Sequence, residues 1–392
     1  MELVIYVHDF TLEIGHSNAM IELCRNIDFK KISRIEVVSY TCSPPPIIFP
    51  HAPDLCQKLH HKKIPFQKIY PSLLKSMFYH LCSAFYYFHK KAYAPNSVHI
   101  SIGAASLLAD IVNIQFVHAQ WNPLFFKHLK MPPLRWIYKK IAYSYFAWTE
   151  KVFFLNPNTK FFALSDFVKN YCQQKFNIPD SHISTIYSGV NLTRFKPTTE
   201  TKSEIIKKLI IEYPQLKVID LKRPIILFVG AFERKGLPQL NQWLKQFPQL
   251  QLLAIGVSEQ SRRSIFPVEF TSCHIAFTDR VATFYDLADA FIFPSLYDPF
   301  GLVVLEAYAK GLPLFTYKNN IGASELILGQ AEVYFFEEAD IINYLRQLTP
   351  LALRARQQIQ RQRHPHLATV NWQNSAEKFL KICQQTQTMR SA

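Results

Sequence analysis

The sequence predicts an α/β protein with two parallel-sheet domains, and three observations support this prediction. The chain has 392 residues, which is more than one ordinary hydrophobic core accommodates. Short apolar runs alternate with segments of helical periodicity in both halves, as in parallel sheets covered by helices. The polar segment 198–204 separates the two halves. We therefore expect one domain over 1–198 and another over 199–372.

The first half begins with an apolar run that reads as a buried strand. Strands are expected at residues 3–7, 35–40, 98–102, 114–117 and 183–187, and helices at 17–26 and between residues 165 and 183. Gly15 lies in the loop before the first helix, and His118 directly follows the strand at 114–117. Ligands bind at the carboxyl ends of parallel strands, so both residues are candidates for a binding site. Asp110 and Gly103 interrupt the apolar stretch 98–117, which argues against a transmembrane helix.

The second half repeats the alternation. Strands are expected at residues 224–229, 252–255, 291–293 and 312–315, and helices at 238–247, 281–288, 300–310 and 372–383. No GxGxxG motif follows a strand, which argues against dinucleotide-binding domains of the dehydrogenase kind.

Residues 291–311, FIFPSLYDPFGLVVLEAYAKG, predict a strand, a tight loop and a helix. Pro299 suits the first turn of this helix, and Asp298 before it can accept hydrogen bonds from the amides that follow. Gly301 would let an anion come close to those amides. The loop is therefore a candidate phosphate site.

Charged residues accompany this loop. Asp298 and Glu306 lie eight residues apart, and carboxylates accept hydrogen bonds from sugar hydroxyl groups. Arg234 and Lys235 follow a predicted strand and precede Gly236 at a helix start, which indicates a clamp for a diphosphate. Taken singly, each residue could be a helix cap or a surface charge. Together they favour a site for a nucleotide sugar.

The segment from Asp298 to Glu306 resembles the signature of the family 4 retaining glycosyltransferases, which include lipopolysaccharide core glycosyltransferases. Pro299, Phe300 and Gly301 lie inside this signature. The family has Glu, seven residues and Glu, whereas this chain has Asp in the first position.

The resemblance implies the GT-B fold, with two facing Rossmann-like, doubly wound domains. The domain at 1–198 would bind the acceptor, and the domain at 199–372 would bind the nucleotide sugar. A C-terminal helix at 373–392 would cross back onto the first domain.

The resemblance also implies roles for individual residues. His118 and Asp298 are assigned to the catalytic centre, His118 near the transferred carbon and Asp298 at the donor sugar. The expected donor-binding residues are Gly15, Arg234, Lys235, Pro299, Phe300, Gly301, Leu302 and Glu306. The family also has a glycine and a glutamate in a turn similar to that of Gly322 and Glu325. Arg234 is expected to replace the arginine that the family carries at the position of Ala231. Because the chain has no DxD triplet, we expect these cations and the helix start, not a metal ion, to neutralise the leaving diphosphate.

The expected reaction is transfer of a sugar, with retention, from a nucleotide sugar to a hydroxyl group of a glycan or glycolipid. A UDP-sugar is the first candidate donor, no further cofactor is expected, and the pathway is lipopolysaccharide or other cell-envelope glycan synthesis. In the family's usual mechanism the leaving phosphate takes the acceptor proton, so no protein base is assigned.

The net charge of +15 is distributed unevenly. Residues 56–149 contain eleven lysines and one arginine against a single acid, Asp110, which gives this region +11. Apolar residues recur at helical spacing over 73–88, and aromatic residues alternate with basic ones over 132–148. Such helices suit an anionic membrane surface, so we expect peripheral attachment at the inner face of the cytoplasmic membrane. In the alternative interpretation the apolar stripes belong to the core and the lysines are simply solvated.

Two further alternatives remain open. The protein could bind a nucleotide sugar without transferring it, because Asp298 and Ala231 depart from the family pattern. It could also bind nucleic acid through its basic, aromatic segments, although it has no recognisable nucleic-acid module and we expect no such partner. Seven dispersed cysteines and an N-terminus that does not read as a signal peptide favour the cytoplasm.

Overall fold

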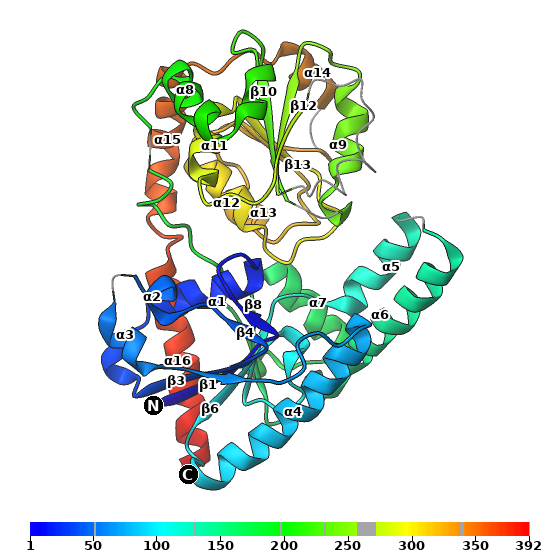
Figure 1. The fold of residues 1–392 in the computed structure, drawn as a ribbon, viewed down its shortest axis with the longest axis vertical. Coiled ribbons are helices and arrows are strands. Elements are labelled where there is room, and N and C mark those ends of the chain that lie inside the picture. Colours follow the sequence, from blue (N-terminus) through cyan, green and yellow to red (C-terminus); the bar gives the residue numbers. More distant parts are fainter. Residues whose placement is uncertain are drawn as a thin grey trace. The chain divides into compact units, whose positions relative to one another are not determined.

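The computed structural model describes residues 1–50, 52–128, 131–196, 198–230, 233–256, 272–337 and 341–391. The chain forms two compact units, and each is described by itself (Figure 1). The first unit consists of Met1–Gly189 and Trp372–Ala392, and the second of Val190–Asn371. The first boundary therefore lies at Gly189 and not at residue 198. The backbone N–H of Val190 donates to the carbonyl of Val370 within the second unit (3.3 Å).

The first unit contains a seven-stranded parallel sheet in the order β5-β3-β1-β6-β7-β8-β9. The strands are β1 (Glu2–Tyr6), β3 (Arg34–Ser39), β5 (Leu59–Lys63), β6 (Val98–Ile102), β7 (Ile111–Ile114), β8 (Lys160–Ala163) and β9 (Ile183–Thr185); β2 (Asp9–Phe10) pairs with β4 (Thr41–Cys42). Chain order reverses between β1 and β6, which makes this the switch point of a doubly wound sheet. The strand predicted at 114–117 is wrong in its position. The strand lies three residues earlier, because its pairing with β6 already begins at Asp110, whose N–H donates to the His99 carbonyl (2.8 Å). β7 therefore ends at Ile114, where the predicted strand would begin.

Helices cover this sheet. They are α1 (Gly15–Arg25), α2 (Pro45–Ile48), α3 (Pro53–Lys58), α4 (Ser72–Tyr93), α5 (His118–His128), α6 (Pro133–Phe154), α7 (Asp166–Phe176) and α16 (Trp372–Ser391). The last helix returns to the first unit, as predicted. The Phe379 ring lies 5.6 Å from that of Phe162, and the Ser375 hydroxyl donates to the Tyr187 carbonyl (2.6 Å).

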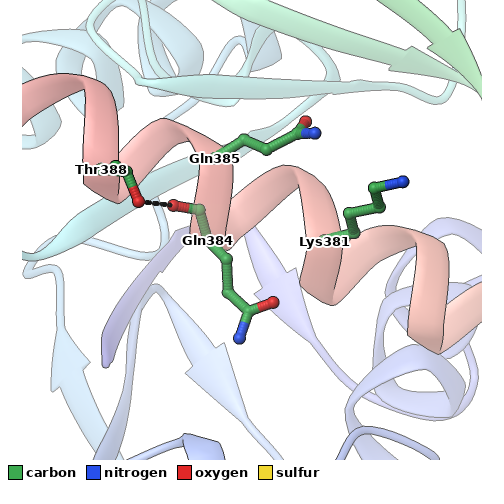
Figure 2. Close-up of a pocket in the computed structure, with 4 residues that line it drawn as sticks. All are labelled: Lys381, Gln384, Gln385 and Thr388. Carbon is green, nitrogen blue, oxygen red and sulfur yellow. Dashed lines mark hydrogen bonds between the residues drawn. The ribbon is translucent and has the colours of Figure 1, made fainter.

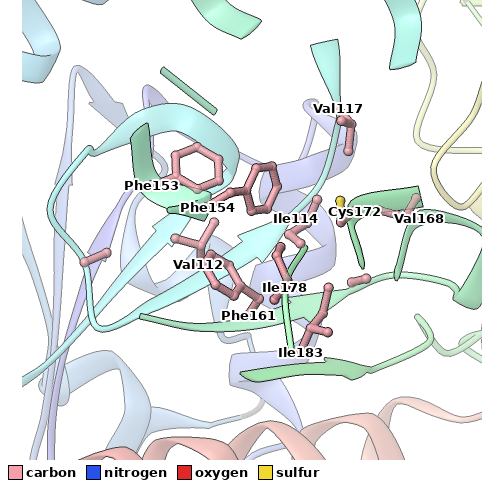
Figure 3. Packing of buried hydrophobic residues seen from close by; sticks show 12 residues of the cluster. Val112, Ile114, Val117, Phe153, Phe154, Phe161, Val168, Cys172, Ile178 and Ile183 are labelled. Atoms are coloured by element: carbon pink, nitrogen blue, oxygen red, sulfur yellow. The ribbon is translucent and has the colours of Figure 1, made fainter. Parts of the chain in front are cut away.

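One core of the first unit lies between β7, β8 and the helices α6 and α7 (Figure 3). Its largest buried side chains are Phe153, Phe154 and Phe161. Burial of each such ring contributes about 1.5–3 kcal/mol relative to exposure. The C-terminal end of α6 is therefore fixed firmly to the sheet.

The second unit contains a six-stranded parallel sheet in the order β12-β11-β10-β13-β14-β15. The strands are β10 (Ile225–Val229), β11 (Gln251–Ile255), β12 (Ser272–Ile275), β13 (Ala290–Phe293), β14 (Leu314–Thr316) and β15 (Val333–Phe335). The helices are α8 (Lys202–Glu212), α9 (Leu237–Leu244), α11 (Val281–Leu287), α12 (Leu302–Ala309), α13 (Ser324–Ile327), α14 (Ile341–Gln347) and α15 (Leu353–Leu367). Chain order reverses between β10 and β13, so the loops after these two strands flank the switch point. The predicted α/β, doubly wound architecture is confirmed in both units.

Candidate active site

The loops that follow β10 and β13 meet at the switch point of the second unit. The Leu296 N–H donates to the carbonyl of Arg234 (2.8 Å). Gly236, which precedes α9, has φ +79°, and a Cβ there would lie 2.0 Å from the Pro294 carbonyl oxygen. Only glycine allows the two backbones to approach this closely. This contact fixes the position of Arg234 and Lys235 beside the signature loop.

The helix of the signature segment begins at Leu302, after Gly301 with φ +86°. The prediction that Pro299 occupies its first turn is therefore wrong. The backbone of Asp298 instead pairs with the loop after β14, because its N–H donates to the carbonyl of Asn320 (2.8 Å). The Asp298 carboxylate accepts the Phe300 N–H (3.4 Å), so it shapes the loop and does not cap the helix. The first turn of α12 follows directly after this loop, and its Val304 N–H donates to the Gly301 carbonyl (2.9 Å).

Two cations share the Asp298 carboxylate. Its Oδ2 lies 3.5 Å from Nη1 of Arg234 and 3.7 Å from Nζ of Lys235. The same Nη1 donates to the Tyr297 carbonyl (2.6 Å), and Nζ of Lys235 lies 5.2 Å from the centre of the Phe293 ring. Asp298 is 7% exposed. The cluster therefore holds two positive charges against one negative charge in a largely desolvated position.

The pKa shifts describe a site that favours an anion. Burial lowers the pKa of Lys235, and the neighbouring charge of Arg234 lowers it further, while Asp298 and Glu306 oppose the shift. A bound phosphate would favour the protonated lysine again, since an opposite charge nearby stabilises the charged form. The cluster can therefore neutralise a diphosphate.

Glu306 lies in the middle of α12, beside the buried Tyr285 of α11. The Tyr285 hydroxyl donates to Oε2 of Glu306 (3.0 Å) and lies 3.1 Å from the carbonyl of Val303. Burial raises the pKa of Glu306, while this hydrogen bond and the charges of Arg194 and Lys235 oppose the shift. A half-buried carboxylate in this position can accept a hydrogen bond from a ligand hydroxyl group.

The turn after β14 completes the loop. The Gly322 N–H donates to the Asp298 carbonyl (3.1 Å), and the Ala323 N–H donates to the Phe300 carbonyl (2.7 Å). Glu325 lies in the first turn of α13. The backbone of this turn therefore supports the signature loop.

In the first unit, His118 begins α5 and is held by the buried Glu150 of α6. Nδ1 of His118 lies 2.7 Å from Oε1 of Glu150, which also accepts the backbone N–H of His118 (2.6 Å). The Ala119 N–H donates to the other carboxylate oxygen (3.1 Å). The rings of Tyr143 and Phe146 flank the imidazole. In a neutral imidazole whose Nδ1–H donates to Glu150, Nε2 is the acceptor nitrogen.

Gly15 is the first residue of α1. A Cβ added to it would meet no atom within 4 Å. The backbone does not require glycine there, and the space beside it is open to a ligand.

A sequence model of the family described as "Glycosyl transferases group 1" matches residues 210–361. This segment, about two fifths of the chain, is therefore similar to group 1 glycosyltransferases. The matched segment includes Arg234, Lys235, Asp298 and Glu306, and the sheet of the second unit brings all four together. Gly15 and His118 lie in the first unit, outside the matched segment.

Known proteins support both the domain and the fold. The "Uncharacterized glycosyltransferase MJ1607" of Methanocaldococcus jannaschii is 28% identical over 150 residues, which are 36% of this chain and 37% of that protein. The other curated relatives are also matched over less than half of their length. The crystal structure of WaaG, a glycosyltransferase involved in lipopolysaccharide biosynthesis, aligns over 98% of this chain and 99% of its own, with TM-score 0.71 and 15% identity. Anabaena HepE in complex with UDP and glucose aligns over 98% and 100%, with TM-score 0.65 and 13% identity. These likenesses show that the chain has the GT-B fold.

Three residues that bear on the site were missed by the sequence analysis. Tyr285 and Glu150 form the hydrogen bonds to Glu306 and His118, and Arg194 acts on Glu306 by its charge. Tyr285 lies in an apolar helix and Glu150 near the end of a basic one, so neither carries a local motif. Only the packing of one element on another brings them to their partners.

Three further points concern Ala231, possible metal ligands and a hollow on α16. Ala231 lies outside the described residues, so the replacement of an arginine by Arg234 stays a prediction. Over the described ranges, no three His, Cys, Asp or Glu side chains form a group that could hold a metal ion. An open hollow on α16 is lined by Lys381, Gln384, Gln385 and Thr388 (Figure 2). It contains none of the predicted site residues.

Proposed function

We propose that the chain is a retaining glycosyltransferase that moves a sugar from a nucleotide sugar to a hydroxyl group of a glycan or glycolipid. The observation that carries this proposal is the cationic cluster of Arg234 and Lys235 beside the start of α12, at the switch point of a unit similar to group 1 glycosyltransferases. A UDP-sugar is the proposed donor, since HepE is described in complex with UDP and glucose. Cell-envelope glycan synthesis is the proposed pathway, since WaaG is described as acting in lipopolysaccharide biosynthesis.

The cations and the helix start would act on the leaving group. Lys235 and Arg234 attract the diphosphate, and the amides after Gly301 donate to it. As the bond between the sugar C1 and the phosphate oxygen breaks, negative charge grows on the diphosphate. Fixed positive charge in a desolvated site stabilises that state more than it stabilises the intact donor.

The remaining residues would orient the donor and the acceptor. Glu306 accepts a hydrogen bond from a ribose hydroxyl, and Asp298 from the donor sugar. His118 serves the transferred carbon, with its imidazole oriented by Glu150. The acceptor oxygen bonds to C1 on the face that the diphosphate leaves, and its proton passes to a diphosphate oxygen. The proposed reaction needs no further cofactor and no metal ion.

Binding of nucleotide sugars to the purified protein tests the proposal first. A ligand at ~100 times its dissociation constant stabilises the unit that binds it by about 2.7 kcal/mol, which shifts its melting temperature measurably. We expect a shift with one or more UDP-sugars, and none with the same ligands in Lys235→Ala. If no nucleotide sugar shifts the wild-type protein, the proposal is wrong.

A second candidate is a protein that binds the donor without transferring the sugar. The ion pairs of Asp298 with Arg234 and Lys235 favour this reading, since they engage a carboxylate that would otherwise hold the sugar. Donor turnover distinguishes the two. Transfer to an added glycan, with retention seen in the anomeric NMR signal of the product, supports the transferase. Binding without turnover to any acceptor supports the silent protein.

A further inference from the structure

Helix α4 buries a polar face. Its buried residues are Ser76, Tyr79, His80, Ser83, Tyr86 and Lys90. His80 pairs with the Tyr145 hydroxyl (2.6 Å) and the Ala104 carbonyl (2.7 Å). Lys90 lies 2.7 Å from a carboxylate oxygen of Glu2 and 2.9 Å from one of Glu36. The buried polar side chains His80 and Lys90 therefore have their partners within the first unit, as buried polar groups require.

The opposite face of α4 is apolar and exposed. It consists of Leu74, Met77, Leu81, Phe85 and Phe88, which are 49%, 41%, 72%, 76% and 66% exposed. Their spacing of three or four residues places them in one line along the helix, called here the α4 stripe. The alternative that these residues belong to the core is therefore wrong. An exposed apolar line on a helix this long marks a surface that binds a partner or a membrane.

Helix α6 carries a second exposed line of apolar residues, the α6 stripe. It consists of Leu134, Ile137, Ile141, Trp148 and Val152, which are 84%, 51%, 57%, 54% and 39% exposed. The spacing is again helical. The stripe includes a tryptophan, a residue enriched where a protein meets the boundary between lipid and water.

The two stripes turn to the same side of the first unit. Helices α4 and α6 run in the same direction, since Ser72 pairs with Tyr138 and His80 with Tyr145 (Figure 1). At ~100° per residue, the α4 stripe lies about 140° from this line of contact, in one sense of rotation. The α6 stripe lies about a sixth of a turn from it, in the opposite sense. Because α4 and α6 are parallel neighbours, stripes that are rotated in opposite senses from the line of contact point to the same side. This side is called here the α4–α6 face.

The segment that carries α4 and α6 is positively charged. Residues 55–165 contain thirteen lysines and one arginine but only two acids, Asp110 and Glu150. Both acids are buried, at 0% and 1% exposed. Lys62, Lys63 and Lys68, in the segment that leads into α4, are exposed. Every exposed formal charge of Lys, Arg, Asp or Glu in the described part of 55–165 is thus a cation.

We propose that the α4–α6 face docks on an anionic lipid bilayer, with the two stripes among the lipids and the lysines at the headgroups. Charge complementarity selects this occupant, because a second copy of so basic a surface would be repelled. Within the described residues, no helix has the length and apolar character needed to cross a bilayer. The proposed attachment is peripheral and uses α4 and α6. It depends on the first unit alone, so it stands or falls separately from the proposed function.

Vesicle flotation of the full chain tests this proposal. We expect the wild-type protein to float with phosphatidylcholine vesicles that contain phosphatidylglycerol, and to do so much less with phosphatidylcholine alone. The double variant Leu81→Glu, Phe85→Glu removes two exposed apolar groups and adds two repelled charges. It should partition at least ~100-fold less, since each buried apolar side chain contributes about 1.5–3 kcal/mol.

The matched control is Ile211→Glu in α8 of the second unit, which alters an equally exposed side chain (84%) and should leave flotation unchanged. A charge variant on α6, Arg135→Gln with Lys140→Gln, should weaken binding to anionic vesicles about fivefold per cation, from about 1 kcal/mol each. Circular dichroism should be unchanged in every variant, because all of these side chains are exposed.

Three results would overturn the proposal. One is flotation of the double glutamate variant at the wild-type level. Another is a wild-type dimer in sedimentation that the same variant dissolves, without vesicle binding, which would assign the face to a second copy. The third is salt-sensitive retention of single-stranded nucleic acid by a protein that ignores vesicles.

Discussion

The two units share one architecture but differ in where their charged and apolar residues lie. Each has a parallel sheet whose chain order reverses at a switch point. The first unit has 23 basic and 12 acidic residues, a net +11, whereas the second has 21 and 17, a net +4. In the second unit opposite charges gather in a half-buried cluster at the switch point. In the first unit the excess cations lie mainly in residues 55–165, the segment that also carries the exposed apolar stripes.

This difference shows that one fold can serve two kinds of recognition. The cluster of the second unit depends on close backbone contacts and desolvated charges, which suit a small, highly charged ligand. The α4–α6 face depends on exposed area and excess charge, which suit a large, soft surface. Substitutions should therefore have different consequences in the two units.

The largest effect is expected from Lys235→Ala. Transfer measured as kcat/KM should fall at least ~100-fold, or about 2.7 kcal/mol, because a desolvated cation at the diphosphate is lost. Lys245→Ala, which removes an exposed lysine of the same unit, is the matched control and should retain wild-type activity. Near-normal turnover in Lys235→Ala would show that the cationic cluster is not part of the active site.

The next effect concerns the glycines of the two switch points. Gly236→Ala should destabilise the second unit by about 2 kcal/mol or more, since its Cβ would meet the Pro294 backbone at positive φ. Gly15→Ala, in open space, should change stability by no more than about 0.5 kcal/mol. Hydrogen exchange of β10 and β1 reports each unit separately. Equal destabilisation by both substitutions would contradict the difference drawn here.

A smaller loss is expected from His118→Ala. Turnover should fall about tenfold, or about 1.4 kcal/mol, because one oriented contact with the transferred sugar is lost. The thermal shift caused by the donor should persist, since the second unit binds the donor. Loss of that shift together with turnover would instead assign His118 to donor binding.

The smallest effect is a change in pH dependence caused by Glu306→Gln. Burial raises the pKa of Glu306, so the folded state binds its proton more tightly than the unfolded chain does. The wild-type free energy of unfolding should therefore fall as pH rises from the unfolded pKa through the raised folded one. The glutamine variant lacks this loss. Its stability relative to wild type, from hydrogen exchange of β13 at matched pH, should increase with pH, and an unchanging difference would contradict the assignment.

Local sequence patterns were sufficient to predict the alternation of strands and helices and the signature loop. An apolar run such as that of β13 is recognisable as a strand, because a strand covered on both faces must be apolar throughout. By contrast, β5 was not predicted. Its sequence LHHKK is exposed except for Leu59, and backbone pairing with β3 alone makes it a strand.

The sequence predicted that Arg234, Lys235 and Asp298 belong to one site, but it did not predict the contacts between them. Pro299 and Asp298 follow the rules for a helix start, yet pairing with the loop after β14 took precedence over them. The periodicity of α4 showed a stripe without showing which side faced solvent. That choice is made by the hydrogen bonds of His80 and Lys90, which connect residues far apart in the sequence.

One consequence follows from α6 alone. Glu150 lies nine residues after Ile141, about 900° around the axis and so roughly half a turn away, on the side of the helix opposite the α6 stripe. With the α6 stripe among the lipids, the thickness of the helix, about 10 Å, would separate His118 from the lipid-facing side. The proposed membrane contact and the imidazole of His118 would thus lie on opposite sides of one helix.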